Sequence, residues 1–167
     1  MRPDVQKENQ NMRRKDREIT DKVKIVNIMK KCDCCNLALN GEEFPYVIPL
    51  SFGFCQENDE LKLYFHSAKE GTKIDFIKRN EKAAFTMHTT HQLELGEKAC
   101  DSTMRYESVC GNGTIRFIEG QEKIKALKCI MNQYEQGKEH VFSEKVLPLT
   151  EVMELTVEHI SGKESKA

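Results

Sequence analysis

The sequence predicts a mainly β protein, in which a small barrel of six strands carries two to three short helices. Six strand-like runs follow one another along the 167 residues, mostly consecutively. Strands that follow one another without regular helical crossovers form antiparallel meanders and barrels, not parallel sheets. The length suits one domain, which we expect at 19–163, between a polar, basic arm at 1–18 and a loose tail at 164–167.

Composition and charge narrow the class of protein. Lysine and arginine number 26 and aspartate and glutamate 27, so a nucleic-acid partner has no electrostatic support. No run approaches the ~20 apolar residues of a membrane span, and the N-terminus lacks the apolar stretch of a signal peptide. The seven cysteines are an odd number without a secretion signal, which favours free thiols in a reducing compartment. We therefore expect a cytoplasmic protein.

The CDCC run at 32–35 is the place where a metal is conceivable. Thiolates at short spacing are the usual ligands of zinc. A structural zinc site needs four ligands, however, and the chain has no second C-x-x-C pair to complete one. We predict no metal and interpret these cysteines as small buried apolar residues.

The first helix is expected at 20–31. Thr20 supplies a capping hydroxyl and Asp21 an acid in the first turn, both typical of a helix start. The apolar side chains that then recur at helical spacing are Val23, Val26 and Met29.

After this helix the pattern changes to that of a β-hairpin. CNLAL, the turn pair Asn40-Gly41 and FPYVIPLSFGFC supply two strands and the turn between them. On the second strand, the face predicted to be core carries Tyr46, Ile48, Leu50, Phe52 and Phe54. The opposite face, a shelf on which a flat molecule could lie, carries Val47, Pro49, Ser51 and Gly53. Because Pro49 cannot donate a ladder hydrogen bond, the strand is expected at an edge or locally unpaired; the alternative is an ordinary outward face with a bulge.

The rest of the chain supplies four more strands and two helices. A turn at ENDE leads to the strand ELKLYFHS, and GTKIDFIKR follows as a short helix with Ile74 and Ile77 inward. EKAAFTMHTTH and RYESVCGNGTIRFI are the fourth and fifth strands, and the fifth can bend at Gly111 or Gly113. The helical apolar positions of EGQEKIKALKCIMNQYEQG, with Gly137 as the C-cap, are Ile124, Leu127, Met131 and Tyr134. The last strand, VMELTVEHISGK, has one face formed by Met153, Leu155, Val157 and His159.

The end of the third strand carries residue types that bind anions. His66 and Ser67 close this strand, and the sequence Gly-Thr-Lys at 71–73 opens the next helix. Phosphate is held by hydroxyls, by free N–H groups at a helix N-terminus and by lysine, so these residues could bind one. The alternative is structural: Ser67 caps the helix and Glu70 completes a capping box. His66 alone fits a proton donor, a ligand or a hydrogen-bonded residue at a strand end.

Four short motifs occur in order: MRRKDR at 12–17, PYVIPLS at 45–51, YFHSAKEGTK at 64–73 and YESVCGNG at 106–113. Together they resemble the pyridoxamine 5′-phosphate oxidase-related, FMN-binding split-barrel proteins, and more closely their NimA-like (5-nitroimidazole resistance) branch. The resemblance extends over about residues 12–163. Four ordered motifs are far more specific than any one of them.

The resemblance implies a six-stranded split β-barrel that forms a homodimer, with two FMN molecules at the subunit interface. The isoalloxazine ring would lie along Pro49–Phe52, and the ribityl and phosphate groups would lie at His66, Ser67 and Lys73. Residues 106–109 would line the same site, from the partner subunit. The residues that it implies for cofactor binding are Val47, Pro49, Leu50, Ser51, Phe52, His66, Ser67, Gly71, Lys73, Tyr106, Ser108 and Val109.

The chain departs from the family in two places. The C-terminal segment VEHISGKESKA lacks the arginine-bearing motifs with which the oxidase binds pyridoxamine phosphate, so that substrate is not expected. Glu107 stands where relatives often carry arginine, which places an extra acid beside the implied site.

The function that the sequence predicts is an FMN-dependent oxidoreductase. It would pass electrons to a small-molecule acceptor, with nitroaromatic compounds as one class, and His66 is the candidate catalytic proton source. Two alternatives remain open. One is a non-enzymatic flavin-binding protein; the other is a split barrel that binds haem or a deazaflavin, with His66 or His159 as a haem ligand.

Overall fold

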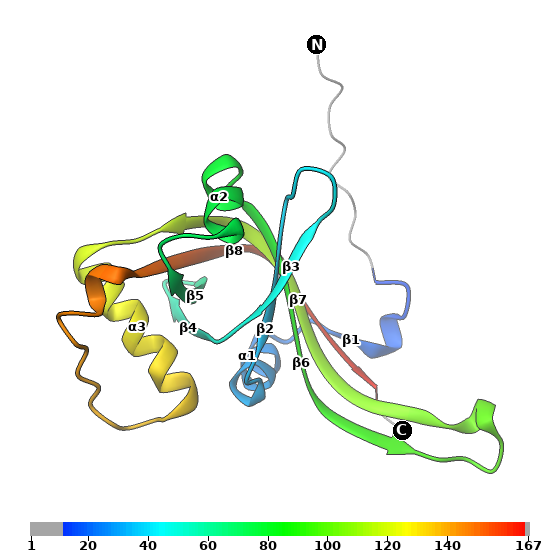
Figure 1. Ribbon diagram of the computed structural model, residues 1–167. Coiled ribbons are helices and arrows are strands. Elements are labelled where there is room, and N and C mark those ends of the chain that lie inside the picture. The colour runs from blue at the N-terminus through cyan, green and yellow to red at the C-terminus, as the bar shows by residue number, and fades with distance from the viewer. Residues whose placement is uncertain (1–11, 166–167) are drawn as a thin grey trace.

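The computed structural model describes residues 12–165, and within them eight strands form one antiparallel sheet (Figure 1). The strands are β1 (Glu18–Ile19), β2 (Cys35–Leu39), β3 (Tyr46–Leu50), β4 (Phe52–Glu57), β5 (Glu60–Ala68), β6 (Lys82–Glu94), β7 (Thr103–Phe117) and β8 (Thr150–Ser165). The helices are α1 (Lys22–Lys31), α2 (Thr72–Arg79) and α3 (Gly120–Tyr134). The strand order is β3-β2-β6-β7-β8-β5-β4, and β1 pairs with β8.

The two ends of this strand order are β3 and β4, which are neighbours in the chain and are separated by Ser51 alone. The sheet therefore curls until its edges meet, but no ladder joins them. This is a split barrel, as predicted. The six expected strands are present, and the count rises to eight because the strand expected at 44–55 divides at Ser51 and because β1 adds a short pair with β8.

The core lies inside the curled sheet. Its largest fully buried side chains include Phe52, Phe65, Leu37 and Met87. The buried face of α1 belongs to the same cluster and is formed by Ile25, Ile28 and Met29. A second, smaller cluster lies under α3 and is formed by Tyr64, Ile118, Ala126, Leu127, Ile130 and Val152.

The start of α1 differs from the prediction. Asp21, not Thr20, is the N-cap: its carboxylate accepts the amide hydrogens of Val23 at 2.8 Å and Lys24 at 3.4 Å. A carboxylate at the cap satisfies amides that have no partner in the first turn and also suits the helix dipole. The helix thus begins later than expected, and Val23 is 69% exposed instead of buried.

Two turns also differ. The hairpin of β2 and β3 is present, but its connection takes residues 40–45 and not the Asn40-Gly41 pair alone. Helix α3 ends at Tyr134 with Glu135 as its C-cap, and Gly137, with φ 79°, lies in the turn beyond. The face of α3 that is buried carries Lys123, Ala126, Leu127 and Ile130, so the expected inward Ile124, Met131 and Tyr134 flank it.

Both ends of the described chain add strand pairs to the sheet. Of the arm expected at 1–18, residues 1–11 lie outside the described part, and Lys15–Arg17 form a 3-10 turn before β1. At the other end, β8 continues through Glu164 and Ser165 and pairs with β7 there.

None of the described helices is both long and apolar enough to cross a membrane.

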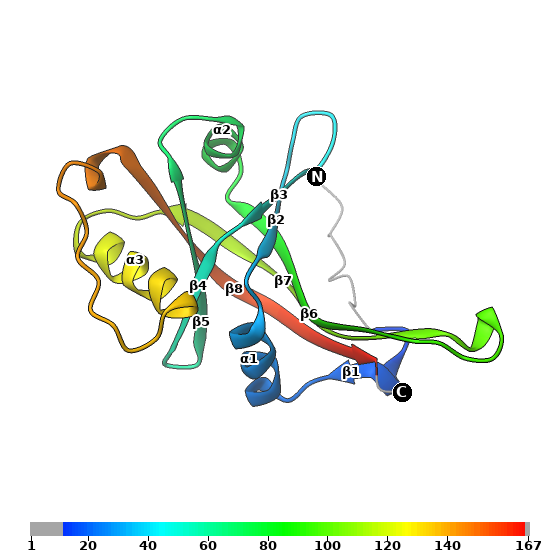
Figure 2. The same cartoon turned by 60° about the horizontal axis from the view of Figure 1, so that its bottom comes forward.

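The longest protrusion is the hairpin of β6 and β7, which extends away from the barrel (Figures 1 and 2). Its register shifts between Thr89 and Gln92, where Thr90 has a positive φ of 57°. Beyond this bulge the hairpin carries exposed apolar side chains at its tip (residues 90–105, here called the hairpin tip): Leu93, Leu95 and Met104. An isolated two-stranded hairpin is only marginally stable in water, and these three apolar side chains are uncovered in the single chain.

Candidate functional site

The small-residue shelf predicted on the second strand is present on β3. Val47, Pro49 and Ser51 are all exposed, and β3 is an edge strand, as Pro49 predicted. Past Ser51 the shelf ends, because Gly53 is buried against the backbone of α3. The shelf continues across the neighbouring strands of the sheet instead. In register with Pro49 lie Asn36 on β2, Thr86 on β6 and Cys110 on β7.

The end of β5 lies beside this shelf. Phe52 of β4 pairs with Phe65 of β5. Ser51, just before Phe52, and His66, just after Phe65, are therefore neighbours across these two antiparallel strands. Successive residues of a strand point to opposite faces, and Phe65 is in the core. His66 therefore faces the α3 side together with the shelf, whereas Ser67 faces the barrel side, where its hydroxyl donates to the Ala68 carbonyl at 2.8 Å.

The N-terminus of α2 follows directly. Gly71 is the N-cap, with φ 125°, and no side chain caps the helix. The capping box of Ser67 and Glu70 that the sequence left open therefore does not form. Ile74 and Asp75 donate to the Gly71 carbonyl, and the amides of the turn before them point out of the helix start. Lys73 makes no hydrogen bond or ion pair with any residue of the described 12–165.

Glu151 is a residue that sequence reasoning missed. It pairs directly with Ser67 across β5 and β8, so the two side chains share one face. Its Oε1 atom is buried and has no hydrogen-bond partner in the described part of the chain. A buried acceptor without a partner is rare, so a donor from a bound molecule would suit it. Only the register of β8 on β5 could have pointed to Glu151, and the sequence does not give that register.

A cavity of about 190 Å³ lies next to His66. It lies between the end of β5, α3 and the segment before β8, and its walls are mainly apolar: Leu127, Ile130, Met131, Phe142, Val146 and Leu147, with Ser143 and Thr150. His66 is exposed overall, but the desolvation of its ring on the cavity side lowers its pKa below the ordinary value of 6.5. The imidazole is thus held neutral near pH 7, with one ring nitrogen able to donate.

Two of the expected site residues are fully buried. The side chains of Phe52 and Val109 belong to the core, so only their backbone could reach a ligand. The amide of Phe52 already donates to the Tyr134 hydroxyl at 3.0 Å, and that hydroxyl donates to the Asp33 carbonyl at 2.8 Å. The amide of Phe52 is therefore not free to bind a ligand.

Tyr106 and Ser108 lie far from the other expected residues within one chain. His66 is in register with Val152 of β8, whereas Ser108 is in register with Lys163, eleven residues further along the same strand. Eleven residues of extended strand span about 35 Å. One copy of the chain therefore cannot bring Ser108 and His66 to one small ligand.

The surroundings of Tyr106 are basic. Although partial burial raises its pKa, hydrogen bonds with Lys163 and Arg17 prevail and lower it overall. The extra acid of this segment, Glu107, is neutralised: its carboxylate accepts from Lys31 Nζ at 2.7 Å and from the Thr90 hydroxyl at 3.0 Å. Glu107 is thus held within its own chain.

The cysteines behave mainly as predicted. All seven are free thiols, and Cys32 and Cys35 of the CDCC run are buried, whereas Cys34 is half-buried. Burial raises the pKa of Cys32 to about 11 and raises that of Cys35 further. Among residues 12–165, no three or more His, Cys, Asp or Glu side chains are grouped to hold a metal ion.

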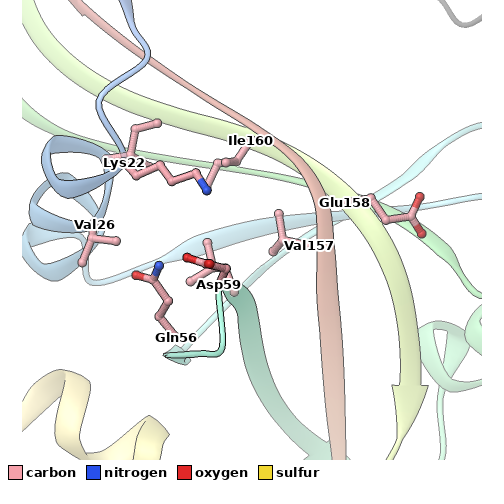
Figure 3. Close-up of a pocket in the computed structure, with 9 residues that line it drawn as sticks. Lys22, Val26, Gln56, Asp59, Val157, Glu158 and Ile160 are labelled. Carbon is pink, nitrogen blue, oxygen red and sulfur yellow. The ribbon is translucent and has the colours of Figure 1, made fainter.

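A separate cavity of about 160 Å³ lies between α1, the turn joining β4 to β5, and β8 (Figure 3). Its floor is apolar, formed in part by Val26, Val157 and Ile160, and Lys22 and Asp59 lie at its rim. None of the expected site residues lines it, so it is not part of the shelf on β3.

These features define an antiparallel split-barrel protein, with an open face of small residues beside a helix that starts without a side-chain cap. The chain belongs to the pyridoxamine 5′-phosphate oxidase family, whose model matches residues 21–164. The family expected from the four motifs is thereby confirmed. None of the curated proteins compared with the chain matches it.

Solved structures agree with this family. A candidate 5-nitroimidazole antibiotic resistance protein from Bacteroides thetaiotaomicron is 34% identical, with a TM-score of 0.75 over 88% of this chain and 86% of that one. An FAD and haem binding protein from Mycobacterium smegmatis has a TM-score of 0.78 at 18% identity, over 90% of this chain and 74% of that one. A flavocytochrome from Azotobacter vinelandii has a TM-score of 0.77 at 17% identity, over 94% and 73%. At 17–18% identity the likeness shows the fold alone.

Proposed function

We propose that the chain is a flavin-binding protein that takes FMN and acts as an oxidoreductase toward a small-molecule acceptor. The observation that carries the proposal is the start of α2. Its first-turn amides have no side-chain cap, and Lys73 has no partner among the described residues. Amides and a lysine of this kind suit a phosphate group, because both favour a negative charge at a helix N-terminus.

The other residues fit the rest of the cofactor. The shelf of Val47, Pro49 and Ser51 is exposed and small enough for a flat ring to lie on it. Oε1 of Glu151, on the Ser67 face of the sheet, has no partner among the described residues and would suit a hydroxyl donor such as a ribityl chain, which FMN and FAD share. A residue with a Cβ at position 71 would meet no atom within 4 Å, so the space in front of the helix is open.

We propose that the complete site forms in a homodimer. Tyr106 and Ser108 are about 35 Å along β8 from the His66 end, so they could line the site only from a second copy. The lysine and arginine around Tyr106 suit a site for an anionic cofactor. The tip of the β6–β7 hairpin, with its exposed Leu93, Leu95 and Met104, gives a second copy an apolar surface to bury.

In the reaction, bound FMN would supply the redox chemistry. The protein would place the acceptor, and the apolar cavity beside His66 favours a small aromatic or otherwise apolar molecule, nitroaromatics included. The neutral ring of His66 would donate a hydrogen bond to the acceptor as it gains electrons, and its minor imidazolium form would be the proton source. The free thiols suit a reducing compartment, in keeping with a place in the cytoplasm.

Haem is the second candidate, because one structural neighbour is described as an FAD and haem binding protein and another as a flavocytochrome. His66 faces an apolar cavity of about 190 Å³, which is far smaller than a porphyrin requires. His159 is exposed on β8 and lines neither of the two cavities described above. FMN therefore accounts for more of the described residues than haem does.

The first experiment is the visible spectrum of the purified protein, followed by identification of what denaturation releases. Paired flavin bands, FMN in the supernatant at about one per chain, and steady NAD(P)H consumption with a nitroaromatic acceptor would support the proposal. A flavin spectrum without turnover would leave a non-enzymatic flavin-binding protein. A Soret band, or a colourless protein that does not take up added FMN, would refute the assignment.

A further inference from the structure

Two cysteines meet where α3 packs on the sheet: Cys55 on β4 and Cys129 on α3. Gly53 lies two residues before Cys55 on the same face, directly under the backbone of Cys129 and Ile130. Both cysteines pack against the small cluster under α3, and both are half-buried free thiols. The position of Gly53 against the Cys129 backbone places Cys55, two residues further along β4, beside Cys129, and the two thiols interact electrostatically.

The surroundings of the two thiols differ. The sulfur of Cys55 lies 3.3 Å from the Tyr64 hydroxyl, whose pKa is raised mainly by burial, so the phenol keeps its proton and can donate it. Lys125 also lies near both thiols, although its pKa is raised first by its hydrogen bond and ion pair with Glu57. The hydroxyl beside its sulfur marks Cys55 as the thiol that would attack. By contrast, burial first and then Cys55 raise the pKa of Cys129 to about 11.

We propose that Cys55 and Cys129 form a dithiol site that a hydroperoxide oxidises to a disulfide. The thiolate of Cys55 attacks one peroxide oxygen, the O–O bond breaks, and the departing oxygen leaves as water after taking a proton. The sulfenic acid left on Cys55 is then attacked by the Cys129 sulfur, which forms the S–S bond and releases a second water. Two sulfurs lose two electrons, and one hydrogen peroxide becomes two waters.

The bond would act on the wall of the His66 cavity. Leu127, Ile130 and Met131, which line that cavity, lie on α3 beside Cys129. Oxidation would tie this helix covalently to β4, whereas in the reduced state packing and hydrogen bonds alone hold it. The inference does not depend on FMN binding, so it can be tested on the protein with or without a cofactor.

The test treats the full chain with hydrogen peroxide, blocks remaining thiols by alkylation and maps peptides without reduction. We expect the loss of two hydrogens, a peptide pair joined through Cys55 and Cys129, and full reversal by dithiothreitol. Because the bond closes a loop of about 75 residues, the melting temperature should rise by about 5–10 °C. Replacing either thiol (Cys55→Ser or Cys129→Ser) should abolish the rise, whereas Cys110→Ser, at an exposed thiol on β7, should not.

A second measurement is independent of oxidation and of the variants. Phenylarsine oxide bridges two neighbouring thiols, so one equivalent should protect Cys55 and Cys129 of the wild-type protein together from alkylation. Independent alkylation of the two, their separate oxidation to sulfinic acids, or a disulfide from Cys55 to a cysteine of the 32–35 run would each overturn the proposal.

Discussion

Gly53 is the position where adding one methyl group should disturb the fold most. A Cβ there would lie within 3.0 Å of three backbone atoms of Cys129 and Ile130, a separation that real Cβ atoms essentially never show. Backbone atoms of a helix cannot rotate away as a flexible side chain does. Gly53→Ala therefore forces α3 off β4.

The expected loss of unfolding free energy in Gly53→Ala is the sum of three contributions. Overpacking against a rigid neighbour costs about 3 kcal/mol. The hydrogen bond from the Phe52 amide to the Tyr134 hydroxyl, which also depends on the seating of α3, adds about 1 kcal/mol. Alanine returns about 0.7 kcal/mol by restricting the unfolded chain. The net loss is about 3 kcal/mol of unfolding free energy.

The assay is urea unfolding followed by circular dichroism. For a chain of this size, about 3 kcal/mol lowers the midpoint by about 1.5 M. The matched control is Gly137→Ala, where a Cβ would meet no atom within 4 Å but φ is 79°. Its left-handed backbone alone should cost about 1 kcal/mol. A loss below about 1 kcal/mol for Gly53→Ala, or a loss for Gly137→Ala that exceeds the loss for Gly53→Ala, would refute the close packing of α3 on β4.

Three further variants test the site and its support. Lys73→Ala should weaken FMN binding by about 10–100-fold, measured by quenching of flavin fluorescence, while Lys78→Ala in the last turn of α2 should leave it within about twofold. Because the folded-state pKa of His66 lies below 6.5, its stabilising effect is complete above pH 6.5 and is lost as pH falls through the folded value. The unfolding midpoint of the wild type should therefore drop more between about pH 7.5 and pH 5 than that of His66→Gln, and equal drops would contradict the desolvation of the ring beside α3. Tyr134→Phe removes the hydroxyl that joins β4 to the segment after α1, and should cost about 1–2 kcal/mol in the urea assay; an unchanged midpoint would show that these bonds are dispensable.

The sequence predicted the strands and the family well, because both depend on short-range patterns. Alternating apolar residues placed the strands, and Ile74 and Ile77 were correctly expected to face inward from α2. Pro49 indicated an edge strand because proline lacks the N–H that a central strand requires. Four ordered motifs were sufficient to indicate the family that the comparisons confirm.

Element ends were harder to predict from the sequence. Thr20 and Asp21 are both good capping residues, and which one caps α1 depends on where Ile25 and Ile28 must point to reach the core. The break at Ser51 is likewise not a local property. It exists because the sheet curls until β3 and β4 meet without pairing.

The sequence by itself therefore determined which residue types can bind a phosphate and lie against a flat ring. It could not place them in space, because strand register and helix packing connect residues far apart in the chain. Only the tertiary structure set His66 beside Ser51, left Glu151 Oε1 without a partner, and put Cys129 against β4. It also placed Ser108 about 35 Å along β8 from the His66 end, which is why the proposed site requires a second copy of the chain.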